Sequence, residues 1–303
     1  MENKLLKPKT KFKDPIKYPF LFAVPALLVY IIFFIYPSVS GFYYAFTNWN
    51  AKTIGYDFVG ISQIIDVLKN PKMLTALKNT FIFAFLTTVT ENVVGLALAL
   101  ALNQKLRTRN TLRAIYFAPA ILNIVACGMV FKGLMHPDTG LFNNVLNAIG
   151  LDKLANGWYT DKHMAIYSTV IMDFWRALGV NMAISLAGLQ SIPQDYYEAA
   201  KIDGAHGWGM LKNITLPLIS NTMTVNIVLT TIGGMRIFDV IYYLTEGGPG
   251  YESQVMQTLA YTYMGKGLWG YSSAISMVLV ILVLAVSLPL LLILRQGDKK
   301  RVG

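Results

Sequence analysis

The stretch PFLFAVPALLVYIIFFIYPSV, from Pro19 to Val39, decides the class of fold. It carries no charged side chain, and it exceeds the ~20 residues that an α-helix needs to cross a ~30 Å hydrocarbon core. The whole chain has the same character, because 54% of its 303 residues are apolar and 14% are charged. We therefore predict an all-α polytopic membrane protein. The first stretch is not expected to be a cleaved signal peptide, since no small-residue cleavage site follows it.

Five further apolar stretches follow, so the sequence predicts six transmembrane helices. They cover residues 19–42, 79–102, 112–132, 164–190, 214–236 and 272–294. Asn123 and Lys132 dilute the third span, as expected of a helix that faces a neighbour or a cavity rather than lipid. Short surface helices are expected in the external segments between the spans, which are residues 43–78, 133–163 and 237–271.

The basic residues are gathered in segments that six spans would place on one side of the membrane. These segments hold 16 of the 26 Lys and Arg residues and six of the 16 acidic residues, so the whole net charge of +10 lies there. An excess of Lys and Arg marks the cytoplasmic side, so both termini are predicted to be cytoplasmic. Nucleic acid is not an expected partner, because the basic tail lacks interleaved aromatic residues that would stack on bases. The predicted parts are a basic cytoplasmic tail, a membrane domain and a short cytoplasmic tail, at residues 1–18, 19–294 and 295–303.

The cytoplasmic segment between the fourth and fifth spans is longer than a simple turn requires. It reads SIPQDYYEAAKIDGAHGWGMLKNITLPLIS, residues 191–220. Ser191 as a possible cap and Gly204 as a stop signal predict a helix over residues 193–203. A second short helix is expected over residues 207–213, before the fifth span.

This structured segment suggests a docking surface. Ala199 and Ala200 are small enough for a partner to approach the helix backbone closely, and Glu198 and Asp203 offer charges that could anchor it. The alternative from composition alone is a surface helix that shields the lower face of the bundle.

The spacing of residues within EAAKIDGAHGWGMLKNITLP resembles the signature of binding-protein-dependent ABC importer permeases. That signature is Glu-Ala-Ala, three residues, Gly, nine residues and Ile-x-Leu-Pro. The matching positions are Glu198, Ala199, Ala200, Gly204, Ile214, Leu216 and Pro217. The resemblance implies a type I ABC importer transmembrane domain, in which residues 191–217 form the coupling loop. Its helix would enter a cleft of the ATPase subunit, with Gly204 making the turn after it.

Other stretches resemble the carbohydrate-uptake branch of this family, of the maltose and glycerol-phosphate permease type, and the resemblance covers most of the chain. They are AGLQSIPQDYYEAAKIDGA, LTEGGPG, GLWGYSSAISMVLVIL and PDTGLFNNVL, which begin at Ala187, Leu244, Gly267 and Pro137. The layout is most similar to the first of the two maltose permeases, without its large external insertion. The resemblance implies a pore-forming subunit that moves a sugar or oligosaccharide across the plasma membrane of a bacterium or archaeon by alternating access.

The family also implies the partners. They are a second permease subunit, two ATP-binding-cassette ATPases, an extracytoplasmic solute-binding protein and membrane lipid. No GxxxxGK[ST] phosphate-binding loop occurs in the chain, so ATP and Mg²⁺ are expected on the ATPase and no cofactor on this chain. We expect neither an enzyme nor a metal site, because His136, His163 and His206 are scattered and the one cysteine, Cys127, suits packing.

Polar residues at membrane depth are the candidates for the substrate path. They are Glu91, Asn92, Asn123, Asn181 and Asn226. Such groups are unfavourable in lipid unless they face a cavity or one another, so hydrogen bonds between helices are the alternative role for each. A proton or cation role for Glu91 would favour a different class, a self-contained secondary transporter or channel.

Charged residues near the predicted outer ends of the fourth and fifth spans have structural roles in this scheme. Arg176 is predicted to be an interfacial anchor beside Trp175, and Arg236 is predicted to form an ion pair with Asp239.

Overall fold

The computed structural model describes residues 20–104 and 106–302, and every regular segment among them is a helix. The predicted basic tail and Lys105 lie outside the described residues. The chain divides into two compact units, residues 1–43 and residues 44–303, and each is described by itself. Among the described helices, five are long and apolar enough to cross a membrane, or six if one sharply bent pair is a single span.

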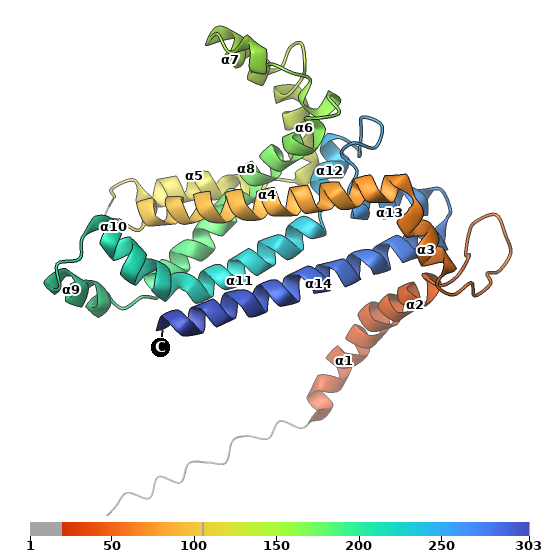
Figure 1. Ribbon diagram of the computed structural model, residues 1–303, viewed down its shortest axis with the longest axis horizontal. Coiled ribbons are helices and arrows are strands. Elements are labelled where there is room, and N and C mark those ends of the chain that lie inside the picture. Colours follow the sequence, from red (N-terminus) through yellow and green to blue (C-terminus); the bar gives the residue numbers. More distant parts are fainter. Residues whose placement is uncertain (1–19, 105, 303) are drawn as a thin grey trace, which may run out of the picture. The chain divides into compact units, whose positions relative to one another are not determined.

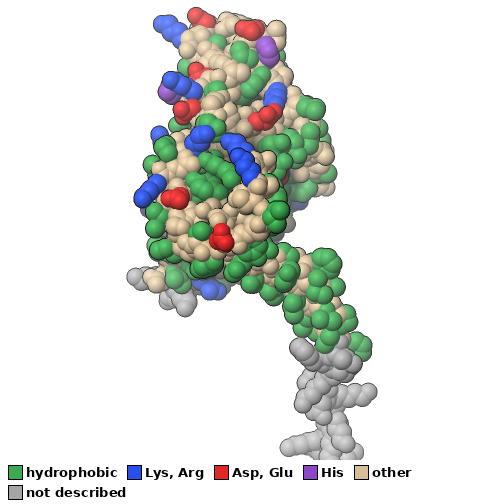
Figure 2. Space-filling model, turned by 90° about the vertical axis from the view of Figure 1, so that its right-hand side faces the viewer, with side chains coloured by type: hydrophobic (Ala, Val, Ile, Leu, Met, Phe, Trp, Pro, Cys, Tyr) green, Lys and Arg blue, Asp and Glu red, His purple; other side chains and the backbone are tan. Residues whose placement is uncertain are grey.

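The first unit is a helix whose apolar side chains are mostly exposed, and Figure 2 shows one apolar face of it. It comprises η1, α1, η2 and α2, with bounds Phe20–Ala23, Val24–Tyr30, Ile31–Ile35 and Tyr36–Tyr44. The η2 segment is one wide π-helical turn, and Pro37 follows directly after it. Proline lacks an N–H and its ring crowds the preceding turn, so a widened turn accommodates it without ending the helix. The first predicted span is therefore one helix, as expected for a stretch that faces lipid.

Four long helices form the centre of the second unit, with α4 packed against α8 and α11, and α11 packed against α14 (Figure 1). Their bounds are Pro71–Leu102 for α4, Ala165–Gln190 for α8, Leu216–Met235 for α11 and Trp269–Val302 for α14. Buried side chains such as Met182, Leu189 and Ile219 fill the space between α4, α8 and α11. The helix α13, Met256–Gly265, packs beside α14.

The second and sixth predicted spans are longer than expected. Helix α4 begins at Pro71 rather than at residue 79, because the Asn70 side chain caps it by accepting a hydrogen bond from the Lys72 amide at 3.0 Å. Lys72 and Lys78 lower the hydropathy of this first part, so an apolar run does not reveal it. Helix α14 likewise continues past residue 294 to Val302.

The third predicted span is broken, which corrects the expectation of a continuous helix over residues 112–132. Helices α5, Arg109–Ile121, and α6, Ile124–Leu134, meet at an angle of 99°. Leu122 is extended, with ψ of 144°, and the Asn123 side chain caps α6 by accepting from the Val125 amide at 2.8 Å. Asn123 is exposed at the break, so its position is that of a helix cap rather than of a polar group in mid-helix.

The short surface helices expected in two external segments are confirmed. Ser62–Lys69 forms α3 and Leu141–Ala148 forms α7, while α12, Asp239–Leu244, packs on α6. Within the second unit, α12 and α13 lie at one end of the long helices, and α9, α10 and the C-terminus lie at the other end (Figure 1). The segment predicted to be cytoplasmic and the C-terminus are therefore at the same end of the bundle.

Candidate functional site

The segment between α8 and α11 carries a rigid exposed helix, α9, whose bounds are Gln194–Ile202. The prediction of residues 193–203 is confirmed to within one residue at each end. Asp195 lies in its first turn and Lys201 in its last, where each charge complements the helix dipole. Gly204 adopts φ of +79°, which lets the Ala205 amide turn back and donate to the Ala200 carbonyl at 2.8 Å.

The cap expected from Ser191 is wrong. Its hydroxyl donates to the Gly188 carbonyl at 2.8 Å and so belongs to the end of α8, while Pro193 stands at the N-cap of α9. Proline fixes the extended backbone that enters the helix without a side-chain hydrogen bond.

The second short helix continues into the fifth span. Gly207–Met210 forms α10, the π-helical turn η5 covers Leu211–Thr215, and α11 follows with Pro217 in its first turn. The arrangement is the same as at Pro37, because a π-helical turn precedes the proline in both places. Three signature residues lie where η5 passes into α11 and are partly buried there, namely Ile214, Leu216 and Pro217. They connect α11 to the segment that carries α9.

The side chains of α9 sort into an inner and an outer face. Glu198, Ala199, Asp203 and Gly204 are exposed, but Ala200 is 5% exposed. Of the two small residues, Ala199 is open to a partner, whereas Ala200 faces this chain's own residues.

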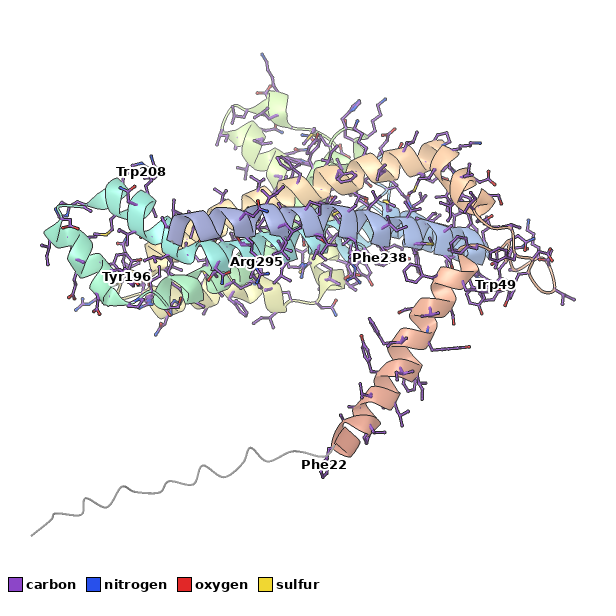
Figure 3. All side chains as sticks on the ribbon, turned by 60° about the horizontal axis from the view of Figure 1, so that its bottom comes forward. Phe22, Trp49, Tyr196, Trp208, Phe238 and Arg295 are labelled. Carbon is purple, nitrogen blue, oxygen red and sulfur yellow. The ribbon has the colours of Figure 1, made fainter. Side chains whose placement is uncertain are left out.

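Three exposed apolar side chains on this segment were not among the predicted site residues. Tyr196 is 52% exposed, Ile202 is 87% exposed and Trp208 on α10 is 73% exposed. Tyr196 and Trp208 are at the same end of the second unit (Figure 3). The residue type alone does not reveal whether a side chain points outward from its helix. The available signal for an exposed contact was a large apolar residue among charged neighbours in a loop predicted to be cytoplasmic.

Polar side chains at the centre of the bundle pair between helices. Asn181 on α8 donates to Glu91 Oε2 on α4 at 2.9 Å, and Asn226 on α11 donates to Asn92 Oδ1 at 2.9 Å. Asn92 donates in turn to the Thr230 hydroxyl at 2.9 Å. The predicted alternative role, hydrogen bonds between helices, is confirmed for these four residues of the candidate substrate path.

A cavity of about 400 Å³ opens beside these pairs. Its polar lining includes Thr87, Glu91, Asp173, Arg176, Asn181, Asn226 and Thr230. Within the described chain, Glu91 Oε1 and Asn181 Oδ1 are buried acceptors without a hydrogen-bond partner. Both residues line the cavity, but these two atoms are shielded from it in this conformation.

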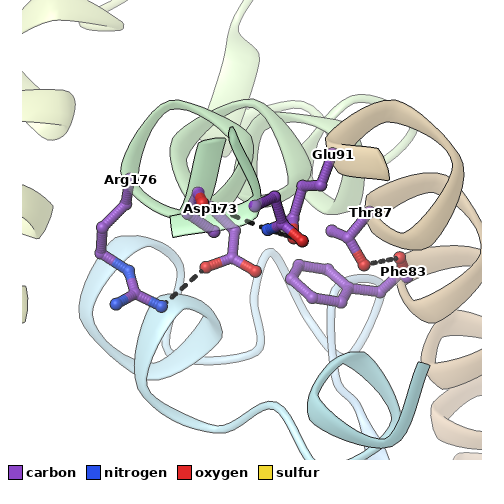
Figure 4. Close-up of polar contacts among 7 residues, drawn as sticks. Phe83, Thr87, Glu91, Asp173 and Arg176 are labelled. Carbon is purple, nitrogen blue, oxygen red and sulfur yellow. Dashed lines mark hydrogen bonds and ion pairs between the residues drawn. The ribbon is translucent and has the colours of Figure 1, made fainter. Parts of the chain in front are cut away.

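The cavity wall also holds an ion pair that the sequence did not suggest. Arg176 Nη2 donates to Asp173 Oδ1 at 3.0 Å across one turn of α8 (Figure 4). Arg176 lines the cavity and pairs with this carboxylate, a contact that its predicted role as an interfacial anchor did not include. Among the described residues the other ion pair is Lys132–Glu246, so the predicted pair of Arg236 with Asp239 is wrong as well.

Replacing Asn181 with Leu is expected to lower the free energy of unfolding by about 1 kcal/mol, because a hydrogen bond between membrane helices is lost and Glu91 loses its donor. The matched change Glu91→Gln should cost less than about 0.5 kcal/mol, since a glutamine oxygen accepts the same bond. Thermal unfolding of the purified protein measures both. Equal losses for the two variants would contradict the contact.

Comparison with known proteins decides the family. Residues 91–300 match the model of the binding-protein-dependent transport system inner membrane component. The chain belongs to this family. The match covers α8, α9 and α11, so the exposed helix and all of the cavity lining except Thr87 lie within the family domain.

The relatives of this inner membrane component include named sugar permeases. The trehalose/maltose transport system permease protein MalF of Thermococcus litoralis is 34% identical over 285 residues, which are 94% of this chain and 95% of that protein. The arabinooligosaccharides transport system permease protein AraP of Bacillus subtilis is 34% identical over 281 residues, 89% of this chain and 86% of that protein.

A solved structure has the same fold as this inner membrane component. A chain of a bacterial ABC transporter involved in the import of the acidic polysaccharide alginate superposes with a TM-score of 0.77 at 24% identity. The superposition covers 94% of this chain and 96% of that one. The permease fold is thereby shown for nearly the whole length.

Proposed function

We propose that this chain is the pore-forming permease subunit of an ATP-binding-cassette importer that moves a sugar or oligosaccharide across the plasma membrane. The observation that carries the proposal is α9, an exposed helix on which Glu198 and Ala199 of the signature are accessible together with Tyr196 and Ile202. Large exposed apolar side chains of this kind mark interaction sites. The partner is a separate ATPase, because the chain has no phosphate-binding loop of its own.

The orientation follows from charge and from the arrangement of the helices. The C-terminus lies at the α9 end of the bundle (Figure 1), and Lys and Arg gather in the segments predicted for this side. The α9 end faces the cytoplasm in our proposal, and the α12 and α13 end faces an extracytoplasmic solute-binding protein. A second permease subunit completes the pore. The cell is a bacterium or an archaeon, and the chain crosses its plasma membrane several times.

In the mechanism, α8 and α11 transmit movement of α9 to the walls of the cavity. Asn181 is nine residues before the end of α8, about 14 Å along the helix axis, and the chain enters α9 within four residues of that end. Asn226 stands on α11, which leads back to α9 through η5. A displacement of α9 by closing ATPases is therefore carried to both walls of the cavity, and alternating access results.

A neutral saccharide suits the cavity chemically. Sugar hydroxyls are donors as well as acceptors, so they can pair with polar groups of the cavity wall such as the Arg176 guanidinium and the Thr230 hydroxyl. Polar contacts of this kind orient a ligand in a pocket. In this scheme Asn92 and Asn226 shape the wall, and Asn123 remains a candidate only at the rim of the path. Proton transport through Glu91 is not part of the mechanism.

Uptake into proteoliposomes tests this proposal against a self-contained transporter. The chain, its partner permease and its ATPase are reconstituted with the solute-binding protein outside, and uptake of labelled trehalose, maltose and arabino-oligosaccharides is followed. At least one sugar is expected to accumulate only with ATP on the ATPase side. Uptake driven by a proton gradient without ATP would contradict the proposal and would favour a secondary transporter.

A further inference from the structure

Two arginines at the start of α5 converge on one neutral side chain. Arg109 and Arg113 are one helical turn apart, and both donate to the side-chain oxygen of Gln190, the last residue of α8, once that amide is oriented toward them. The contact from Arg113 Nη2 is 2.8 Å long. The Nε atoms of both arginines are buried and have no hydrogen-bond partner in the described chain.

Neither charge has an ion-pair partner among the residues whose side chains the structure describes, 22–104 and 106–297. The ion pairs there involve Lys132 and Arg176. The pair also stands in the first two turns of a helix, where the dipole is unfavourable for cations and favourable for anions. Two guanidinium groups with spare donors at this position are suited to a phosphate group.

A cavity of about 420 Å³ continues from these arginines between α5 and α8. Arg113 and Gln190 line its polar end, and the rest of its lining is apolar, namely Ala114, Phe117, Met182, Ala183, Leu186 and Ala187. The apolar part leads from the helix ends toward the middle of both candidate spans. A small soluble anion would leave this part unused, whereas a phospholipid fills it with an acyl chain.

We propose that Arg109, Arg113 and Gln190 bind the phosphate of an anionic phospholipid, with its acyl chain lying against the exposed lining residues Ala114, Phe117 and Ala187. With α9 on the cytoplasmic side, the lipid lies in the cytoplasmic leaflet, and this orientation rests on the proposed function. The evidence for the lipid site itself does not depend on it. The headgroup lies where α8 ends and the chain turns into α9, so the lipid steadies the junction through which motion passes from α9 to the cavity.

Native mass spectrometry of the delipidated transporter complex, titrated with phosphatidylglycerol or phosphatidylcholine, tests the site without any transport assay. Wild type is expected to retain phosphatidylglycerol preferentially. The double variant Arg109→Gln, Arg113→Gln should bind it at least about tenfold more weakly, since charge-assisted contacts to phosphate are lost. The matched variant Arg107→Gln removes a charge from the same exposed link and should bind as wild type does.

A second variant keeps the charges and fills the apolar part. Ala187→Trp, at an exposed residue of the lining, should also weaken phosphatidylglycerol binding, while unfolding temperatures in phosphatidylcholine stay within a few degrees of wild type for both variants. Equal affinity in the double variant and Arg107→Gln would overturn the proposal. So would displacement of the lipid by inorganic phosphate at equal concentration, or unchanged lipid binding in Ala187→Trp, because the pocket would then hold a soluble anion or a partner's carboxylate.

Discussion

Replacing Ile202 with Asp is expected to reduce ATP-driven sugar uptake at least about tenfold while the complex still inserts and folds. Ile202 is 87% exposed in this chain, so its change disturbs no internal packing. In the assembled importer it would be an apolar anchor at the contact with the ATPase, and loss of such an anchor typically costs about 2 kcal/mol or more of binding free energy. Uptake and co-purification of the ATPase measure the effect.

The control for this prediction is Ile54→Asp, at an equally exposed isoleucine in the external segment between the first and second spans. Uptake by this variant should remain within about twofold of wild type, as for most surface changes. If Ile202→Asp transports as well as Ile54→Asp, Ile202 is not part of the coupling contact.

The second large effect is expected at Gly179, where α5 crosses α8. A Cβ added there would lie 2.7 Å from Phe117 Cα and even closer to the Tyr116 carbonyl oxygen, so the backbone of α5 would have to move. Gly179→Ala should therefore lower the free energy of unfolding by about 1–3 kcal/mol, the usual range for overpacking. The thermal midpoint of the purified protein should fall by about 5 °C or more.

Gly133→Ala in α6 supplies the matched comparison, because a Cβ there meets nothing within 4 Å. Its midpoint should stay the same or rise slightly, since alanine favours a helix. A Gly179→Ala protein as stable as Gly133→Ala would show that α5 does not cross α8 at this distance.

Hydropathy was sufficient to locate the spans but not their ends or their breaks. The run around Asn123 is apolar on both sides, so its average hides the 99° bend between α5 and α6. Pro119 and Asn123 were the local signals, one restricting the backbone and the other supplying the cap. Hydropathy missed the start of α4 for the opposite reason. Lys72 and Lys78 lower the mean hydropathy of its first turns, so these turns resemble a loop in the sequence.

The coupling segment could be predicted in place and length because glycine and proline act locally. The positive φ of Gly204 and the position of Pro217 follow from the conformations these residues allow. Which face of α9 is exposed depends on packing against η5, and that is why the burial of Ala200 was missed.

The membrane-depth site was predicted as a set of polar residues but not as a geometry. Glu91, Asn181 and Asn226 were named because polar groups are unfavourable in lipid. Their pairing across three helices needs the register of α4 against α8 and α11, which the sequence of one chain does not contain. Asp173 was missed because a carboxylate one turn from an arginine resembles a surface pair until its burial is known.

Disulfide crosslinking tests most directly whether the exposed face of α9 docks onto a separate ATPase. With Cys127 replaced by Ala, a cysteine is placed by Ile202→Cys, by Ala200→Cys or by Ile54→Cys, and the ATPase carries single cysteines along its cleft. We expect the Ile202→Cys chain to crosslink strongly in the assembled complex and the buried Ala200→Cys and external Ile54→Cys chains to crosslink weakly or not at all. Absence of a crosslink from Ile202→Cys in a complex that co-purifies with its ATPase would contradict the account.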